Sequence, residues 1–175
     1  METKMEKTSS TQDIVSQNEL VRPPWQSLVN IEFLLIGDKI DFDDITAKLG
    51  FSPTTISKKG EPCKFINKCI TEDCWEYSTG NIIEGDAGKL LREVCDLFKA
   101  KNKILKFVVK KYKTEIRINV VIYIKNGDIP GLYFEKDIIK FFYDIGAEID
   151  VDMYVCESDA FGILGLNFIP GQSPD

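Results

Sequence analysis

The stretch Gly-Ala-Glu-Ile-Asp-Val-Asp-Met-Tyr-Val, residues 146–155, alternates between apolar and polar side chains after its glycine. The apolar members are Ala147, Ile149, Val151, Met153 and Val155, and the polar members between them are Glu148, Asp150, Asp152 and Tyr154. Strict alternation is typical of a β-strand with one face in a core and the other in water. We therefore predict a half-buried strand that holds Ile149, Val151 and Met153 inside and three carboxylates outside.

A second strand is predicted over residues 114–125. Its inner face is entirely aliphatic, formed by Ile116, Ile118, Val120, Ile122 and Ile124. Residues 134–145 carry apolar side chains at helical steps of three and four, and Gly146 is placed to end that helix. Together with the stretch at 146–155, these segments predict one β-α-β unit.

An earlier part of the chain has the same order of elements. Residues 31–36 predict a strand, Asp41 is placed to cap a helix over 42–49, and a short strand follows at 74–79. Two β-α-β units predict an α+β, ferredoxin-like fold with a four-stranded antiparallel sheet and helices on one face. The connection at 51–73 is long for such a domain and has no assigned role.

An inserted helical segment is predicted at about residues 86–112, between the two units. Residues 86–99 have a clear helical stripe, whereas residues 101–113 fit either a helix or a strand. We favour a helix for the latter because its lysines leave one apolar face free, formed by Ile104, Phe107, Val108 and Tyr112.

The chain divides into three parts by composition. Residues 1–27 are polar and predict a loosely ordered leader, and residues 28–158 predict a single domain. Residues 159–175 form an apolar tail that we expect to pack on the domain or on a neighbour. The first residues lack the apolar segment of an export signal, so we expect a cytoplasmic protein.

The absence of histidine is the sharpest compositional fact. It removes the commonest general base, the Ser-His and Cys-His nucleophile pairs, and every metal site that needs an imidazole. The five cysteines are an odd number and are expected to be reduced thiols. The Cys63, Cys69 and Cys74 spacing is wider than that of known zinc motifs. We therefore predict no catalytic residue, no cofactor and no metal site, and we do not favour an enzyme.

The net charge of -6 disfavours nucleic acid as a partner. Seven lysines from Lys99 to Lys113 could form a phosphate-binding stripe, but we interpret them as the solvent-exposed face of an amphipathic helix. No apolar stretch is long enough to span a bilayer, so no membrane association is expected.

Acidic residues gather in two places. Glu148, Asp150 and Asp152 could hold a divalent ion, but a solvated strand face is the favoured interpretation because no glycine-rich calcium loop accompanies them. Four more lie around one turn at Asp38, Asp41, Asp43 and Asp44, where helix capping explains two of them.

The solvent face of the predicted sheet is the candidate binding surface. Its members are Glu32, Arg117, Asn119, Tyr123, Glu148, Asp150, Asp152 and Tyr154. Aromatic side chains among charges resemble the composition of protein interfaces. Such a face can bind a basic protein or pair with a second copy of the chain.

The assembled motifs resemble a bacterial domain-of-unknown-function family, number 4279. The resemblance covers roughly residues 31–154 and rests on residues 42–54, on Lys59-Gly60-Glu61, on Trp75 and on residues 146–154. It implies a small bacterial cytosolic protein without an established activity, and it supplies no catalytic residue.

Our working hypothesis is a non-catalytic protein-interaction module that binds a basic partner through its acidic sheet face. An immunity or antitoxin-like role is one form of this hypothesis. A carboxylate- or metal-dependent enzyme and a small-molecule sensor are the alternatives.

Overall fold

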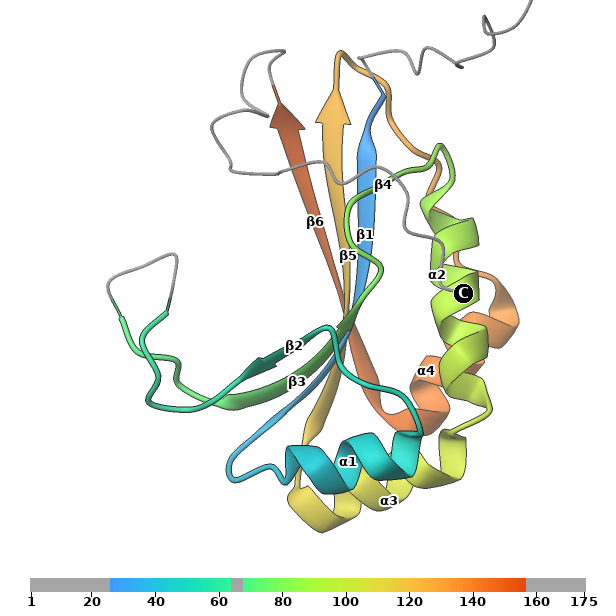
Figure 1. The fold of residues 1–175 in the computed structure, drawn as a ribbon. Helices are drawn as coiled ribbons and strands as arrows, with labels where there is room; N and C mark the ends of the chain where they lie inside the picture. The colour runs from blue at the N-terminus through green and yellow to red at the C-terminus, as the bar shows by residue number, and fades with distance from the viewer. Residues whose placement is uncertain (1–25, 64–67, 157–175) are drawn as a thin grey trace, which may run out of the picture.

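The fold is taken from a computed structural model that describes residues 26–63 and 68–156. The elements, in chain order, are β1 (Leu28–Gly37), α1 (Phe42–Leu49), β2 (Thr55–Ser57), β3 (Asp73–Ser78), β4 (Ile82–Ile83), α2 (Ala87–Lys99), α3 (Asn102–Tyr112), β5 (Glu115–Lys125), α4 (Lys136–Ile145) and β6 (Ala147–Cys156) (Figure 1). Residues 1–25 of the predicted leader and the whole predicted tail, 159–175, lie outside the described residues.

The described strands form one mixed, six-stranded sheet in the order β2-β3-β1-β5-β6, with β4 also paired to β1. β1 is antiparallel to β3, β4 and β5, whereas β5 and β6 are parallel. The α+β class is confirmed. The ferredoxin-like, four-stranded antiparallel sheet is wrong, because the sheet has more strands and one parallel pair.

The error lies in the first predicted β-α-β unit. β2 and β3 form an antiparallel pair, so the chain reverses once more before β3 lies beside β1. β1 and β3 are therefore antiparallel neighbours, and the strand parallel to β1 that follows α1 is β2, which β3 separates from it. In β5-α4-β6, in contrast, the helix connects two parallel strands that are adjacent in the sheet.

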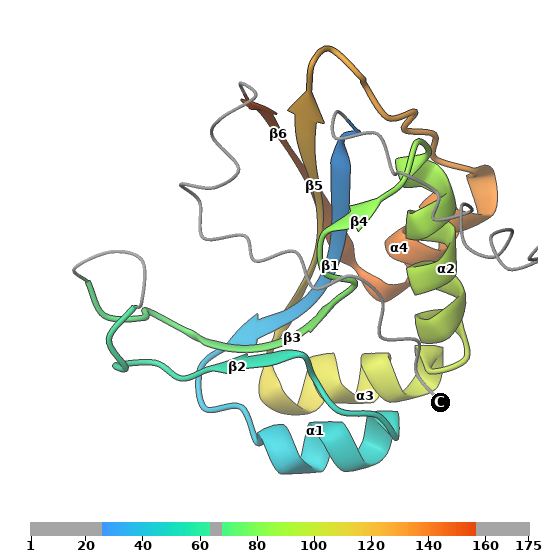
Figure 2. The same ribbon diagram turned by 45° about the horizontal axis from the view of Figure 1, so that its top comes forward.

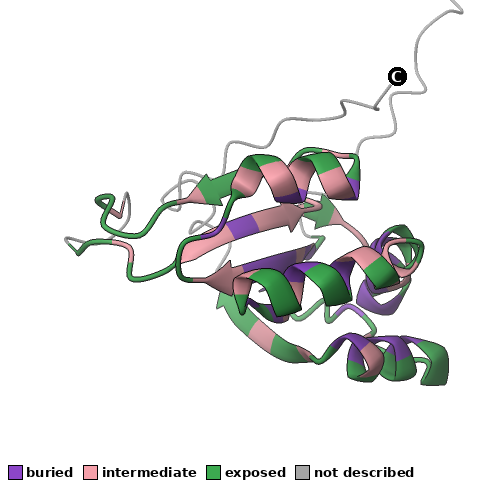
Figure 3. Cartoon of the chain, turned by 90° about the horizontal axis from the view of Figure 1, so that it is seen from below, coloured by how far each residue is buried: buried purple, intermediate pink, exposed green. Residues whose placement is uncertain are grey.

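The core lies between the sheet and the helices. β1 and β5 point alternate residues into it, among them Ile31, Phe33 and Ile118, and α2 and α4 pack against the same side. Figures 1 and 2 show α2 and α4 along one side of these strands and α1 with α3 across one end. Each of these helices is purple toward the core and green outward in Figure 3.

An aromatic cluster joins the end of the sheet to the helices. Phe33 of β1 stacks on Phe98 of α2 with ring centroids 3.6 Å apart, and Phe51 meets Trp75 and Tyr77 edge-on. The Trp75 indole N–H donates to the Thr46 hydroxyl of α1 at 3.1 Å. Each fully buried large side chain of this kind contributes about 1.5–3 kcal/mol to folding.

α1 has the predicted bounds and caps. The Asp41 carboxylate accepts the Asp44 amide N–H at 2.9 Å, and Gly50 ends the helix with a φ of 80°. The helix predicted for residues 101–113 is confirmed as α3, but its stripe differs. Of the predicted members, Val108 is buried and Ile104 and Tyr112 pack against the core. Leu105 is also buried, whereas Phe107 is 48% exposed beneath the ammonium groups of Lys48 and Lys111.

The predicted burial of β6 is wrong. Ile149 is 40% exposed and Met153 61% exposed, and only Ala147 and Val151 among the inner-side residues pack against the core. The alternation is real, since each of these residues pairs in register with an aliphatic residue of β5. β6 is the last strand of the sheet, however, and the helices bury β5 more completely than β6.

Charged side chains hold α2 against α4. Arg92 of α2 forms two hydrogen bonds with the Asp137 carboxylate, both 2.7 Å long, and also bonds Glu135. Lys99 donates to the same Asp137 carboxylate at 2.7 Å. Hydrogen bonds from Arg92, then from Lys99, lower the pKa of Asp137 well below its usual range.

We predict that Asp137→Asn lowers the urea midpoint of unfolding at pH 7. Because the folded pKa lies below the unfolded value of about 3.9, the carboxylate stabilises fully above about pH 5 and loses its effect as the pH falls through the folded pKa. The midpoint difference between the two proteins should therefore shrink below about pH 4. Asp150→Asn, which removes a carboxylate without an ion pair among the described residues, is the control and should show little change.

The first turn of α2 packs closely on the loop that precedes α4. The Ala87 N–H donates to the Gly131 carbonyl at 2.7 Å, and the Gly131 N–H donates to the Gly85 carbonyl at 2.9 Å. A Cβ at Gly88 would lie 2.7 Å from the Tyr133 carbonyl oxygen, which is backbone. This contact requires glycine at position 88 and places the loop against α2.

We predict that Gly88→Ala destabilises the protein by about 1–3 kcal/mol, the range for overpacking a close contact. Gly85→Ala is the matched control, because a Cβ there would meet nothing within 4 Å. Urea unfolding of both variants measures the difference. Equal midpoints would show that the loop can move away from α2 without cost.

Candidate binding face on the open side of the sheet

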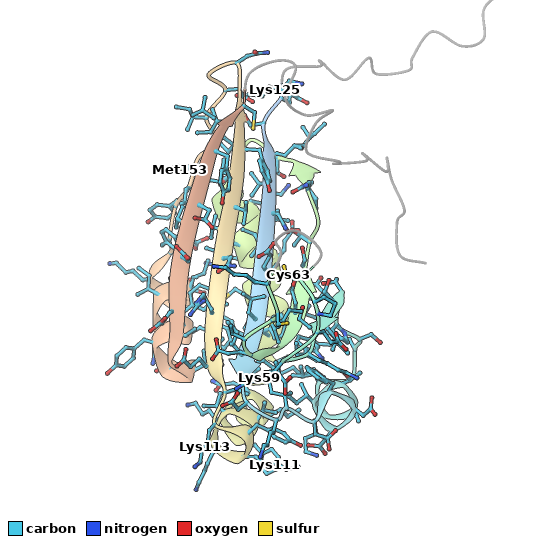
Figure 4. The ribbon with its side chains drawn as sticks, turned by 90° about the vertical axis from the view of Figure 1, so that its left-hand side faces the viewer. Lys59, Cys63, Lys111, Lys113, Lys125 and Met153 are labelled. Carbon is cyan, nitrogen blue, oxygen red and sulfur yellow. The ribbon has the colours of Figure 1, made fainter. Side chains whose placement is uncertain are left out.

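All eight residues of the predicted surface lie on the side of the sheet opposite the core. Their register defines three rows across the strands: Glu32 with Asn119 and Asp150, Arg117 with Glu148, and Tyr123 with Tyr154. Asp152 pairs with Val121 on the same side. We call this side the outer face. Figure 4 looks onto it, and β6, β5 and β1 stand in front of the helices there.

Hydrogen bonds order the middle of the outer face. The Glu32 carboxylate accepts the side-chain amides of Asn30 at 2.8 Å and of Asn119 at 3.0 Å. Asn30 in turn accepts the Ser78 hydroxyl at 2.7 Å. β3, β1 and β5 are thereby joined by side chains as well as by backbone.

The side-chain carbonyl oxygen of Asn119 in this row, Oδ1, is buried without a hydrogen-bond donor among the described residues. A buried acceptor without a partner costs roughly 1–3 kcal/mol. A donor from outside the described residues would recover that cost.

Two tyrosines stack beside this row. The rings of Tyr123 and Tyr154 have centroids 5.4 Å apart and planes 22° apart. Burial raises the pKa of the Tyr123 phenol, with a smaller contribution from Tyr154. Tyr154 remains 49% exposed, so the pair presents aromatic area to solvent.

The carboxylates of β6 are the accessible charges. Glu148 and Asp150 are exposed and Asp152 is half-buried. None of the three has an ion-pair partner within the described part of the chain. They are free to attract a cation or a basic side chain.

β3 adds residues to the outer face that the sequence prediction missed. Glu76 lies beside Leu34 of β1, and Cys74 and Ser78 point the same way. Burial, and then the charge of Glu32, raise the pKa of Glu76. The alternation around Trp75 and Tyr77 already placed Glu76 opposite these aromatics, but only the pairing with β1 shows which face of the sheet that is.

The other acidic cluster has structural contacts. Asp44 forms ion pairs with Lys48 and Lys111 and accepts the Tyr112 hydroxyl at 2.7 Å. Asp38 pairs with Lys59 at 2.6 Å. Across residues 26–63 and 68–156, no three acidic or cysteine side chains are grouped closely enough to hold a metal ion.

Two of the thiols, those of Cys74 and Cys95, are poorly suited to nucleophilic chemistry. Burial raises the pKa of Cys74 to about 12 and that of Cys95 to about 11. Both are protonated at neutral pH, and the thiolate is the reactive form. Cys74 therefore contributes shape rather than reactivity to the outer face.

Together these features define an α+β domain whose mixed sheet is covered by helices on one side and presents an ordered, acidic and aromatic face on the other. The chain belongs to the family described as "Domain of unknown function (DUF4279)", whose model matches residues 27–156. No curated protein and no solved structure matches the chain. None of the described helices combines the length and apolar character needed to cross a bilayer.

We predict that Glu76→Gln raises stability at pH 7. The folded pKa of Glu76 is raised, so ionisation of this carboxyl above about pH 4.3 costs stability, and the neutral amide avoids that cost. The gain should be under ~1 kcal/mol because solvent screens a half-exposed charge.

The gain should disappear near pH 3, where Glu76 is protonated in both states. Urea midpoints at the two pH values measure it. Glu148→Gln, an exposed carboxylate of the same face, is the control and should gain less. A larger gain for Glu148→Gln would contradict the environment described for Glu76.

Proposed function

We propose that this chain is a non-catalytic protein-interaction module that binds a basic protein through its outer face. The observation that carries the proposal is a sheet face that no described helix covers. It holds a stacked tyrosine pair and carboxylates that have no ion-pair partner between residues 26 and 156, apart from the undescribed residues 64–67. Half-exposed aromatics among charges are typical of binding interfaces.

The two kinds of side chain would have different tasks. Asp150, Asp152 and Glu148 would steer a basic partner toward the face and accelerate association, an effect that salt screens. Tyr123 and Tyr154 would supply apolar contact area at little entropic cost, since each ring is already held by its neighbour. The hydrogen-bonded row at Glu32 would give the partner a fixed polar centre.

An immunity or antitoxin-like role is one biological form of this proposal. Domains that act on nucleic acid carry basic surfaces that contact phosphates. An acidic face that covers such a surface would block it without any chemistry. A toxin gene next to the gene for this chain would favour this form of the proposal.

The test uses Asp150→Lys combined with Asp152→Lys. A partner captured with the tagged wild-type chain is identified, purified and titrated by calorimetry. We expect at least about tenfold weaker binding for the variant, since reversing two facing charges costs well over 1.4 kcal/mol. Wild-type binding should also weaken as salt rises.

The matched control is Asp43→Lys combined with Glu93→Lys, which changes the net charge equally on two helices. Both positions are exposed and lie on α1 and α2, away from the outer face. Binding by this control should stay near the wild-type value. An equal loss of affinity in both variants would show that only the net charge matters. Unchanged affinity in both would show that the partner does not bind the outer face.

A further inference from the structure

The outer edge of β6 is a long row of backbone groups without a partner strand among the described residues. β6 pairs with β5 from Ala147 to Cys156 in unbroken register, and it is the last strand in the sheet. Exposed edges template the addition of another strand. Natural edge strands are usually protected by charged side chains, most often lysine, by proline or by a bulge. Residues 147–156 contain no lysine, proline or bulge, and their three charged residues all lie on the outer face.

Apolar side chains accompany this edge on the core side of the sheet. Ile149 is 40%, Met153 61% and Val155 80% exposed. We call these three residues the edge strip. Met153 stands at the free side of β6 in Figure 4. An exposed strand edge with an apolar strip is a surface that another segment is expected to cover.

A second copy of the chain fits this edge poorly when the two β6 strands overlap along nearly their full length. Two β6 strands paired antiparallel about Val151 would set Asp150 of each directly opposite Asp152 of the other. Like charges in directly opposite positions destabilise a sheet. The occupant should bring apolar residues to the edge strip and small or polar residues to the acidic row.

We propose that residues 161–169 of the same chain add to β6 as a further, antiparallel strand. They read Phe-Gly-Ile-Leu-Gly-Leu-Asn-Phe-Ile, and they begin five residues after β6 ends. The four residues between, Glu-Ser-Asp-Ala at 157–160, suffice for a hairpin loop. The short connection gives the segment a high effective concentration at the edge.

The register set by that loop matches the chemistry on both sides of the strand. Directly opposite residues point to the same side of a sheet. On the core side, the pairs are Met153 with Leu164, Val151 with Leu166, and Ile149 with Phe168. On the outer face, Tyr154 meets Ile163, Asp152 meets Gly165 and Asp150 meets Asn167. At the end of the pairing, Glu148 meets Ile169. A slip by one residue would place Leu166 beside Asp152 and Phe168 beside Asp150, so this register is strongly preferred.

The added strand completes the domain beyond the part that the family model matches. It covers the edge strip and leaves the carboxylates of Asp150 and Asp152 on the open outer face. The inference therefore stands independently of the proposed partner. It also limits where that partner can bind, because the edge is occupied while the face is not.

Cross-linking of the full chain tests the register. Met153→Cys with Leu164→Cys places two thiols on directly opposite positions, about 4.5–5.5 Å apart between Cβ atoms, within reach of a short bis-thiol reagent. Met153→Cys with Asn167→Cys is the matched control, since position 167 lies on the other face. Peptide mapping by mass spectrometry distinguishes these links from those to native cysteines.

We expect the first pair to link within one chain at least about fivefold more than the control. Equal linking would overturn the register, and links between two chains would show that a second copy covers the edge instead.

Hydrogen exchange supplies the second measurement. Leu164→Asn with Leu166→Asn should speed exchange of β6 amides by about tenfold or more, because the outward amides lose their partners. Amides of β1, in the middle of the sheet, serve as the internal control and should not change. Unchanged β6 exchange would overturn the proposal. Faster exchange in β1 as well would indicate global unfolding of the variant. In that case the cross-linking result decides whether residues 161–169 pair with β6.

Discussion

The antiparallel pairing of β1 with β5 is the constraint on which the rest of the structure depends. It runs from Leu28 opposite Tyr123 to Ile36 opposite Glu115, and it sets the apolar, core-facing sides of the two strands next to each other. α2 and α4 cover that side because its burial is the main stabilising term available to a chain of this size. β3, β4 and β6 each pair directly with one of these two strands, and β2 joins the sheet through β3.

The same pairing decides what the opposite side carries. Since side chains alternate along a strand, aliphatic residues on one side require the intervening residues to lie on the other. Glu32, Asn119 and Asp150 therefore form a row without being adjacent in sequence. The acidic outer face is a consequence of the core, and it is ordered by hydrogen bonds that cross three strands.

Ion pairing differs between the helices and β6. Several charges on the helices form ion pairs with each other, as in the Arg92 pairing with Asp137 and the Lys111 pairing with Asp44. β6, in contrast, carries carboxylates without ion-pair partners among the described residues. Both proposals therefore concern β6: its carboxylates for the binding of a partner, and its edge for the addition of residues 161–169.

Sequence patterns alone determined the helices, most strands, the eight residues that share the outer face and the N-cap at Asp41, because periodicity and capping are local. Strand direction, the short strands β2 and β4, and the exposure of Ile149 and Met153 were decided only by the tertiary structure. The alternation of β6 is the same whether the strand is central or at an edge. Which it becomes depends on the order of the strands, and the exposure of Ile149 and Met153 depends on how far the helices reach across the sheet. Both are set by residues distant in the chain.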